Sequence, residues 1–165
     1  MLYYLLAVYL KNIMVMCVFI VLYFLSAFSG NVFSFLFTGE NGYSIGASTA
    51  VFGLIGAELI FFYQNRKLFG SYAKQAISNT LFIIAINLFI GLTPSIDNWG
   101  HVGGLLGGMM FAWFASPVWK VSGLESNLSP NFSLVDQRES REVYIGIFLV
   151  LLIFGAMATW GLFFK

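Results

Sequence analysis

Residues 100–112 read GHVGGLLGGMMFA, and this stretch decides how the chain can fold. Its small residues recur every four positions, in a long series and a short one: Gly100, Gly104, Gly108 and Ala112, and Gly103 with Gly107. Residues four apart share one face of an α-helix, so these faces have almost no side chains. A neighbouring transmembrane helix can therefore approach backbone to backbone.

The apolar segment Ser48–Tyr63 is a suitable partner for this face. It has small positions of its own, at Ala50, Gly53, Gly56 and Ala57. We expect Gly104 and Gly108 to pack against Ala50, Gly53 and Ala57.

The composition of the whole chain indicates a membrane protein. Of its 165 residues 59% are hydrophobic and only 9% are charged, and the mean hydropathy is +0.86. Soluble domains have about 25% charged residues. No basic stripe suggests nucleic-acid binding. With one histidine and one cysteine, the usual multi-histidine metal sites are excluded, and we expect no metal and no cofactor.

Five apolar segments predict an all-α, polytopic transmembrane helical bundle. They are separated by short loops and one polar stretch, and cover Ile13–Phe37, Ser48–Tyr63, Ile77–Leu92, His101–Ser116 and Val143–Phe164. Alternation of these helices assigns seven of the eight lysine and arginine residues to one side, leaving Lys165 alone on the other. The excess of positive charge marks the cytoplasmic side. Ser48 and His101 then lie at the outer ends of their helices, at similar depth.

Ser48 and His101 are the candidate catalytic residues. A serine hydroxyl becomes a good nucleophile when a neighbouring base takes its proton. Taken alone, Ser48 is more typical of a packing serine, and His101 also fits a histidine at a helix end. Their joint placement favours a nucleophile and a general base, with Phe52 one turn below Ser48 and able to lie against the imidazole. Ser48 also follows a glycine-rich approach, residues 39–46.

Three motifs resemble those of rhomboid intramembrane serine proteases. GASTAVFG at residues 46–53 is similar to the family's serine motif, NWGHVGG at 98–104 to its histidine motif, and YFLSAFSGN at 23–31 to the helix before the serine helix. The resemblance implies a Ser48–His101 dyad that cleaves transmembrane segments of other proteins near the outer face. It implies no cofactor, and transmembrane substrates in the lipid bilayer as partners.

The resemblance also suggests how the chain is divided. Residues 1–116 would form part of the protease core, residues 117–142 a cytoplasmic loop, and residues 143–165 an extra C-terminal helix. The expected location is a bacterial plasma membrane, with the active site toward the outer side.

Two departures from the family pattern stand out. Thr49 follows the serine where the family usually has glycine, and we expect its branched side chain to narrow substrate access. Residues 1–10 look like the trailing half of the family's second helix. The His-x-x-x-Asn motif of that helix would then precede Met1. The alternative is that residues 1–10 lie along the cytoplasmic surface of the membrane. Without those oxyanion donors we expect this chain to be at least about 10²-fold slower than a complete enzyme.

Other function classes remain open at this point. An inactive rhomboid-like protein would bind transmembrane segments without cutting them. A channel or transporter would need polar residues along a path through the membrane, and only Glu58 lies at depth. We expect Glu58 to be a protonated, hydrogen-bonded packing group, and Asp97 a solvated loop charge.

Overall fold

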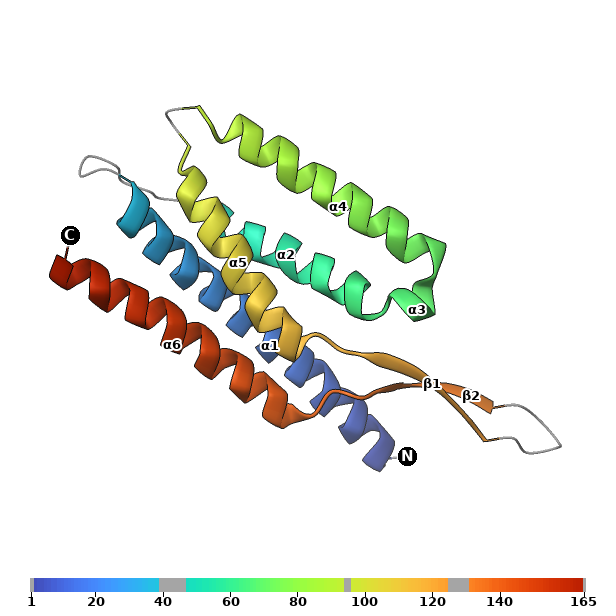
Figure 1. The fold of residues 1–165 in the computed structure, drawn as a ribbon. Coiled ribbons are helices and arrows are strands. Elements are labelled where there is room, and N and C mark those ends of the chain that lie inside the picture. The colour runs from blue at the N-terminus through green and yellow to red at the C-terminus, as the bar shows by residue number, and fades with distance from the viewer. Residues whose placement is uncertain (1, 39–46, 94–95, 125–130, 165) are drawn as a thin grey trace.

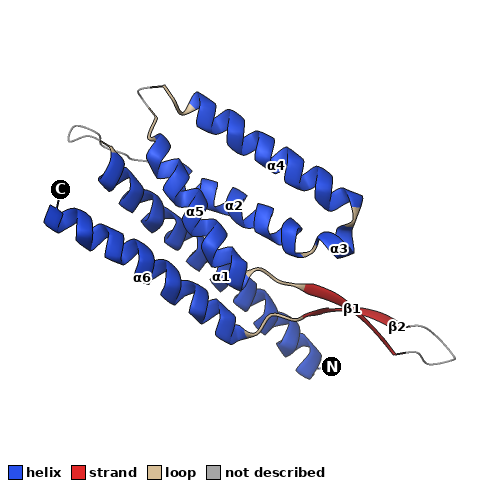
Figure 2. Cartoon of the chain, in the orientation of Figure 1, coloured by secondary structure: helices blue, strands red, loops and turns tan. Residues whose placement is uncertain are grey.

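The computed structural model describes residues 2–38, 47–93, 96–124 and 131–164. Helices make up most of this part of the chain (Figure 1, Figure 2). In chain order, the elements are α1 (Leu2–Phe37), α2 (Ser48–Gln64), α3 (Arg66–Phe69), α4 (Ser71–Ile90), α5 (Asn98–Ala115), β1 (Trp119–Leu124), β2 (Asn131–Asp136) and α6 (Ser140–Phe164). The expected glycine-rich approach to Ser48, residues 39–46, lies outside the described residues.

A bundle of long helices forms the body of the molecule, with α5 at its centre. Helix α5 packs against α1, α2 and α6, whereas α4 packs against α2 (Figure 1). Within the described residues, three helices are long and apolar enough to cross a bilayer, namely Val15–Phe37 of α1, α4 and α6, and α2 is a shorter apolar helix. The predicted polytopic helical bundle is confirmed.

The glycines of α5 explain its central position. A Cβ added at Gly104 would overlap the carbonyl oxygen of Thr49, and one at Gly108 would overlap the backbone of Gly53, so this face meets α2. A Cβ added at Gly103 would lie 2.6 Å from the carbonyl oxygen of Ser29, so the second face meets α1. The predicted contact with the serine helix is confirmed near Gly53, and the second glycine series has its own partner helix.

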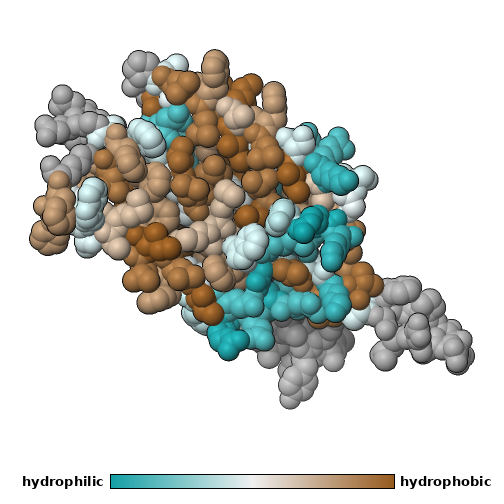
Figure 3. All heavy atoms as spheres, in the orientation of Figure 1, coloured by the Kyte–Doolittle hydropathy of each residue, from teal (hydrophilic) through white to brown (hydrophobic). Residues whose placement is uncertain are grey.

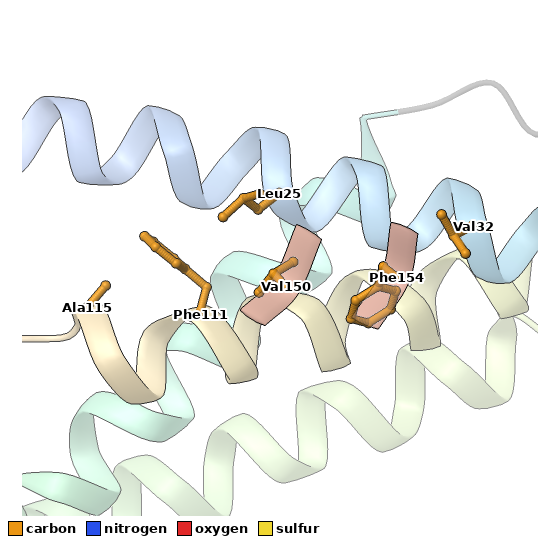
Figure 4. Close-up of a cluster of buried hydrophobic side chains, with 6 residues drawn as sticks. All are labelled: Leu25, Val32, Phe111, Ala115, Val150 and Phe154. Carbon is orange, nitrogen blue, oxygen red and sulfur yellow. The ribbon is translucent and has the colours of Figure 1, made fainter. Parts of the chain in front are cut away.

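Helix α6 completes the bundle on the side away from α2. Its Val150 and Phe154 are buried against side chains of α1 and α5 (Figure 4). Figure 4 shows Leu25 and Val32 of α1 and Phe111 of α5 around them. The predicted C-terminal helix is thus packed into the core.

The two ends of the bundle differ in polarity. Helices α2 and α5 both begin at one end, which we call the Ser48 end; α3, the hairpin and the N-terminus lie at the other, the Gln64 end (Figure 1). On the face shown in Figure 3, hydrophobic residues cover the middle, and hydrophilic residues gather toward the Gln64 end. This distribution is what a bundle spanning an apolar layer requires.

Two local features differ from the segments that the sequence predicts. The first helix does not begin at Ile13: α1 is one continuous helix of 36 residues from Leu2 to Phe37, about 54 Å long, and it includes most of residues 1–10. No proline or glycine occurs between Met1 and Ser29 to interrupt it. Residues 117–142 are not only loop, because β1 and β2 pair as an antiparallel hairpin, with Val121 opposite Leu134 and Ser122 opposite Ser133.

Arg138 ties three helix ends together at the Gln64 end. Its Nε donates to the carbonyl oxygen of Ser116 at 2.9 Å, and one terminal nitrogen reaches Gln64 Oε1 and the carbonyl of Trp113, each at 3.1 Å. The other terminal nitrogen forms an ion pair with Glu142 at 2.5 Å. The Arg138 side chain is only 15% exposed, so its bonds to Ser116, Gln64 and Glu142 are partly sheltered from water, whereas the bond to the Trp113 carbonyl is exposed.

Replacing Arg138 by methionine should lower the free energy of unfolding by about 2–3 kcal/mol. The change removes charge-assisted hydrogen bonds from a half-buried site, and the Ser116 carbonyl and the Glu142 carboxylate lose their bonds to Arg138, whereas the Trp113 carbonyl keeps the bond from Gln64 Nε2 at 2.8 Å. Chemical denaturation in detergent micelles would measure the loss. Arg141→Met is the matched control, because the Arg141–Glu139 ion pair is exposed at both ends and should contribute less than about 1 kcal/mol. Equal effects of the two substitutions would contradict this account.

Candidate active site

Ser48 and His101 meet at the Ser48 end of the bundle. Ser48 is the first residue of α2, and His101 lies in the first turn of α5. The close packing of these helices at Gly104 leaves 3.0 Å between His101 Nε2 and Ser48 Oγ, a hydrogen-bonding distance. The expected proximity of the two side chains is confirmed.

The two residues differ in exposure. Ser48 is exposed, whereas His101 is only 7% exposed. The ring of Phe52 stacks on the imidazole, with centroids 4.2 Å apart and an interplanar angle of 10°. Phe52 thus restricts rotation of His101 as expected, and holds Nε2 toward an accessible hydroxyl.

Phe52→Leu should lower any cleavage rate about 2- to 10-fold. Leucine fills much of the space, but the aromatic pair is worth about 0.5–1.5 kcal/mol beyond burial, and a freely turning imidazole would often face away from Ser48. The kcat/KM for a transmembrane substrate would measure this. Val51→Leu is the control, because Val51 is the adjacent, exposed residue of the same helix. An unchanged rate in Phe52→Leu would show that the stack does not orient the base.

The second imidazole nitrogen has no carboxylate bonded to it within the described part of the chain. Nδ1 of His101 is buried and has no hydrogen-bond partner among the described residues. The nearby Asp97 is the N-cap of α5: its Oδ1 accepts a bond from the Gly100 N–H at 2.9 Å. Asp97 is therefore a helix cap, and the expectation of a merely solvated loop charge is wrong. An aspartate just before a helical pattern was the available sequence indication.

Thr49 does not narrow access to Ser48. It is only 3% exposed and points into the core, where a Cβ added at Gly30 would lie 2.8 Å from its Cβ and one at Gly100 would lie 2.9 Å from its Cγ2. Two glycines on neighbouring helices make the space that the threonine fills. The expected effect of Thr49 on substrate access is wrong for this reason.

Glu58 lies at the expected distance from Ser48, but it is not the packed group that its position in the sequence predicts. It lies on α2 about ten residues, or about 15 Å, beyond Ser48, and its side chain is exposed rather than packed. It takes no part in the Ser48–His101 pair. Among the described residues, no three His, Cys, Asp or Glu side chains lie close enough to hold a metal ion.

The arrangement suits proton transfer between an exposed hydroxyl and a shielded base. With Nδ1 protonated, Nε2 can accept the hydroxyl proton of Ser48. Burial of His101 beneath Phe52 favours a single orientation of the ring. These are the elements of nucleophilic catalysis by an activated serine.

Comparison with known proteins gives one consistent family. Residues 1–118 match the family model for the Rhomboid domain. RHOMBOID-like protein 2 of Arabidopsis thaliana is 35% identical over 146 residues, which cover 87% of this chain and 45% of that protein. Rhomboid protease GluP of Bacillus subtilis is 41% identical over 95 residues, covering 57% of this chain and 18% of GluP.

Not every relative is named as an enzyme. Inactive RHOMBOID-like protein 8 of Arabidopsis thaliana is 40% identical over 86 residues, covering 52% of this chain and 24% of that protein. The chain spans less than half of the length of these curated relatives. No solved structure matches it significantly. The Rhomboid domain match covers most of the chain, and the chain therefore belongs to the rhomboid family.

Proposed function

We propose that this protein is an intramembrane serine endopeptidase that uses Ser48 as nucleophile and His101 as general base. The observation that carries the proposal is the 3.0 Å approach of His101 Nε2 to an exposed Ser48 Oγ. The similarity to GluP, which is named a rhomboid protease, supports it. Membership of the rhomboid family makes serine-protease chemistry the first expectation for this pair.

The reaction follows from the positions of the two side chains. Ser48 Oγ attacks the carbonyl carbon of the scissile peptide while His101 Nε2 takes the hydroxyl proton. His101 returns that proton to the leaving amine, which leaves an acyl group on Ser48. A water molecule, deprotonated by His101, then releases the acyl group and restores the serine.

When Ser48 attacks the scissile peptide, negative charge develops on its carbonyl oxygen. The start of α2 contributes to stabilising that charge. The first amide groups of a helix have no partner within it, and they carry partial positive charge. Ser48 is the first residue of α2, so these amides lie beside the nucleophile. Donors of this kind stabilise an oxyanion.

The proposed substrates are transmembrane segments of other proteins, cut near the outer face. Hydrolysis needs water, and both residues lie at a helix end rather than at mid-depth. The seven-to-one excess of basic residues at the other end supports an outward-facing site. The proposed location is a bacterial plasma membrane; GluP is a bacterial relative, and the Arabidopsis thaliana relatives are plant proteins. Residues 1–116 would then be core, and α6 an added helix.

A second candidate is an inactive rhomboid-like protein that binds transmembrane segments. The similarity to Inactive RHOMBOID-like protein 8 favours this alternative. The retained and closely placed Ser48 and His101 favour the protease.

A fluorophosphonate probe, which reacts with activated serines, would separate the two functions. The protein in native membranes should become labelled, and peptide mapping should find the label on Ser48. Cleavage of a fluorescent transmembrane substrate should occur in the same preparation. A protein that is folded by circular dichroism but neither labels nor cleaves would favour the inactive alternative.

A further inference from the structure

A basic surface lies at the Gln64 end of the bundle, where α3 joins α2 to α4 (Figure 1). Arg66 and Lys67 belong to α3, and Lys74 lies in the first turn of α4. All three side chains are exposed, and we call them the α3–α4 corner. Residues 59–96 contain these three basic residues and no aspartate or glutamate, so this part of the chain has an excess of positive charge.

Other basic residues at the same end have acidic neighbours. The two ion pairs within the described part of the chain are Arg138–Glu142 and Arg141–Glu139, and both lie at the start of α6. Residues 136–142 contain three acidic and two basic residues, so their charges nearly cancel. The positive charge at this end is therefore concentrated at the α3–α4 corner.

Packing and a buried hydrogen bond hold the corner in place. The ring of Phe69 in α3 packs against Phe61 and Phe62 of α2, with centroids 5.8 Å apart in both pairs. Asn65 is only 2% exposed, and its Nδ2 donates to the carbonyl oxygen of Pro117 at 2.9 Å. Helix α3 thus buries part of its aromatic residue and leaves its two basic side chains exposed. A surface that is already ordered loses little entropy when it binds a ligand.

The depth of the corner identifies the kind of partner. Helix α4 is apolar and long enough to cross a bilayer, so Lys74 lies within one turn of the start of a span. Tyr72 is 62% exposed and Tyr63 is 45% exposed, and tyrosine rings are enriched at the level of the lipid headgroups. A lysine side chain can extend its ammonium group into that layer. The nearest anions at this depth are therefore lipid phosphates.

We propose that the α3–α4 corner binds the headgroup of an anionic phospholipid in the leaflet at the Gln64 end. The Arg66 guanidinium lies 4.4 Å from the centroid of the Tyr63 ring, and its Nη1 donates to the Tyr63 carbonyl oxygen at 2.8 Å. That bond uses one of the five N–H donors of the group, and the planar guanidinium suits bidentate binding of phosphate. Lys67 and Lys74 add two positive charges, which favour a lipid with a net negative charge over a zwitterionic one.

Native mass spectrometry of the 165-residue protein would test the proposal. The protein is released from micelles that contain equal amounts of phosphatidylglycerol and phosphatidylcholine, and each retained lipid is identified by its mass. The wild type should retain phosphatidylglycerol about 5- to 25-fold more often than phosphatidylcholine. A basic residue near the headgroups contributes about a 5-fold preference, and three residues that share one phosphate contribute less than the product of three such factors.

Two triple variants with the same net charge separate the corner from the charge of the whole protein. The first has glutamine at all three positions of the α3–α4 corner, and its preference should fall below about 2-fold. The matched control also loses three positive charges, through Lys120→Gln, Arg141→Gln and Lys165→Gln. The control should keep most of the wild-type preference. Circular dichroism should show the same helical content in both variants, because every described side chain that is replaced is exposed.

Three results would overturn the proposal. One is equal retention of the two lipids by the wild type. Another is an equal loss of preference in the two triple variants, which would assign the effect to net charge alone. The third is displacement of the bound lipid by inorganic phosphate, which would assign the corner to a free phosphate ion. Displacement is not expected, because the acyl chains hold the headgroup at the depth of the corner.

Discussion

Ser48→Ala is expected to reduce cleavage of a transmembrane substrate by at least about 10³-fold, and His101→Ala to do the same. Removing the hydroxyl eliminates the nucleophile, and removing the imidazole leaves the hydroxyl without the base 3.0 Å away. The double variant should be no slower than either single variant, because a nucleophile and its base act as one unit. The measurement is the initial rate in membranes, with expression matched by immunoblot.

Ser29→Ala provides the matched control for loss of a serine hydroxyl. Ser29 Oγ donates to the carbonyl oxygen of Leu25 at 2.8 Å, so it is a packing serine of α1. Its removal should leave most of the activity. A chelator such as EDTA should also have no effect on a reaction that uses only the serine and the histidine. Cleavage that persists in Ser48→Ala, or that EDTA abolishes, would refute the mechanism.

Gly104→Val is expected to lower activity by at least about 10²-fold without altering either proposed catalytic residue. The new side chain would overlap the carbonyl oxygen of Thr49, so α5 must move away from α2. A displacement of about 1 Å between reacting groups costs about 10²-fold in rate. The forced separation should also lower the free energy of unfolding by about 1–3 kcal/mol. Cleavage rates and chemical denaturation would measure the two effects.

Gly155→Val on α6 is the matched control for this change. It makes the same substitution in the same kind of helix, but a Cβ at Gly155 has nothing within 4 Å. Activity and stability should therefore stay close to those of the wild type. Full activity in Gly104→Val would mean that the approach of α2 and α5 does not hold the dyad together.

The class of fold and the residues of the candidate site can be predicted from the amino-acid sequence alone. Low charge and long apolar segments predict a membrane bundle because hydrocarbon excludes both exposed charge and unpaired backbone. Glycines four apart predict a close helix contact because helical periodicity is a local property. Ser48 and His101 could be paired from depth alone, since both follow loops assigned to the same side.

The contacts of individual side chains could not be predicted from the sequence, because they depend on which helices pack together. Thr49 could be placed only once Gly30 and Gly100 were known to face it from two other helices. Arg138 joins α2, α5 and α6 through bonds to residues as far as 74 positions away, and no local pattern indicates such a partner.

Dependence on distant parts of the chain also explains why the sequence did not predict the hairpin or the exposure of Glu58. The hairpin β1–β2 depends on pairing across residues 125–130, and the exposure of Glu58 depends on how α1 and α5 border α2. Local periodicity determines which face of a helix is apolar or small. Which segment covers that face depends on contacts between distant parts of the chain, because packing and hydrogen bonding select among several helices that would each fit.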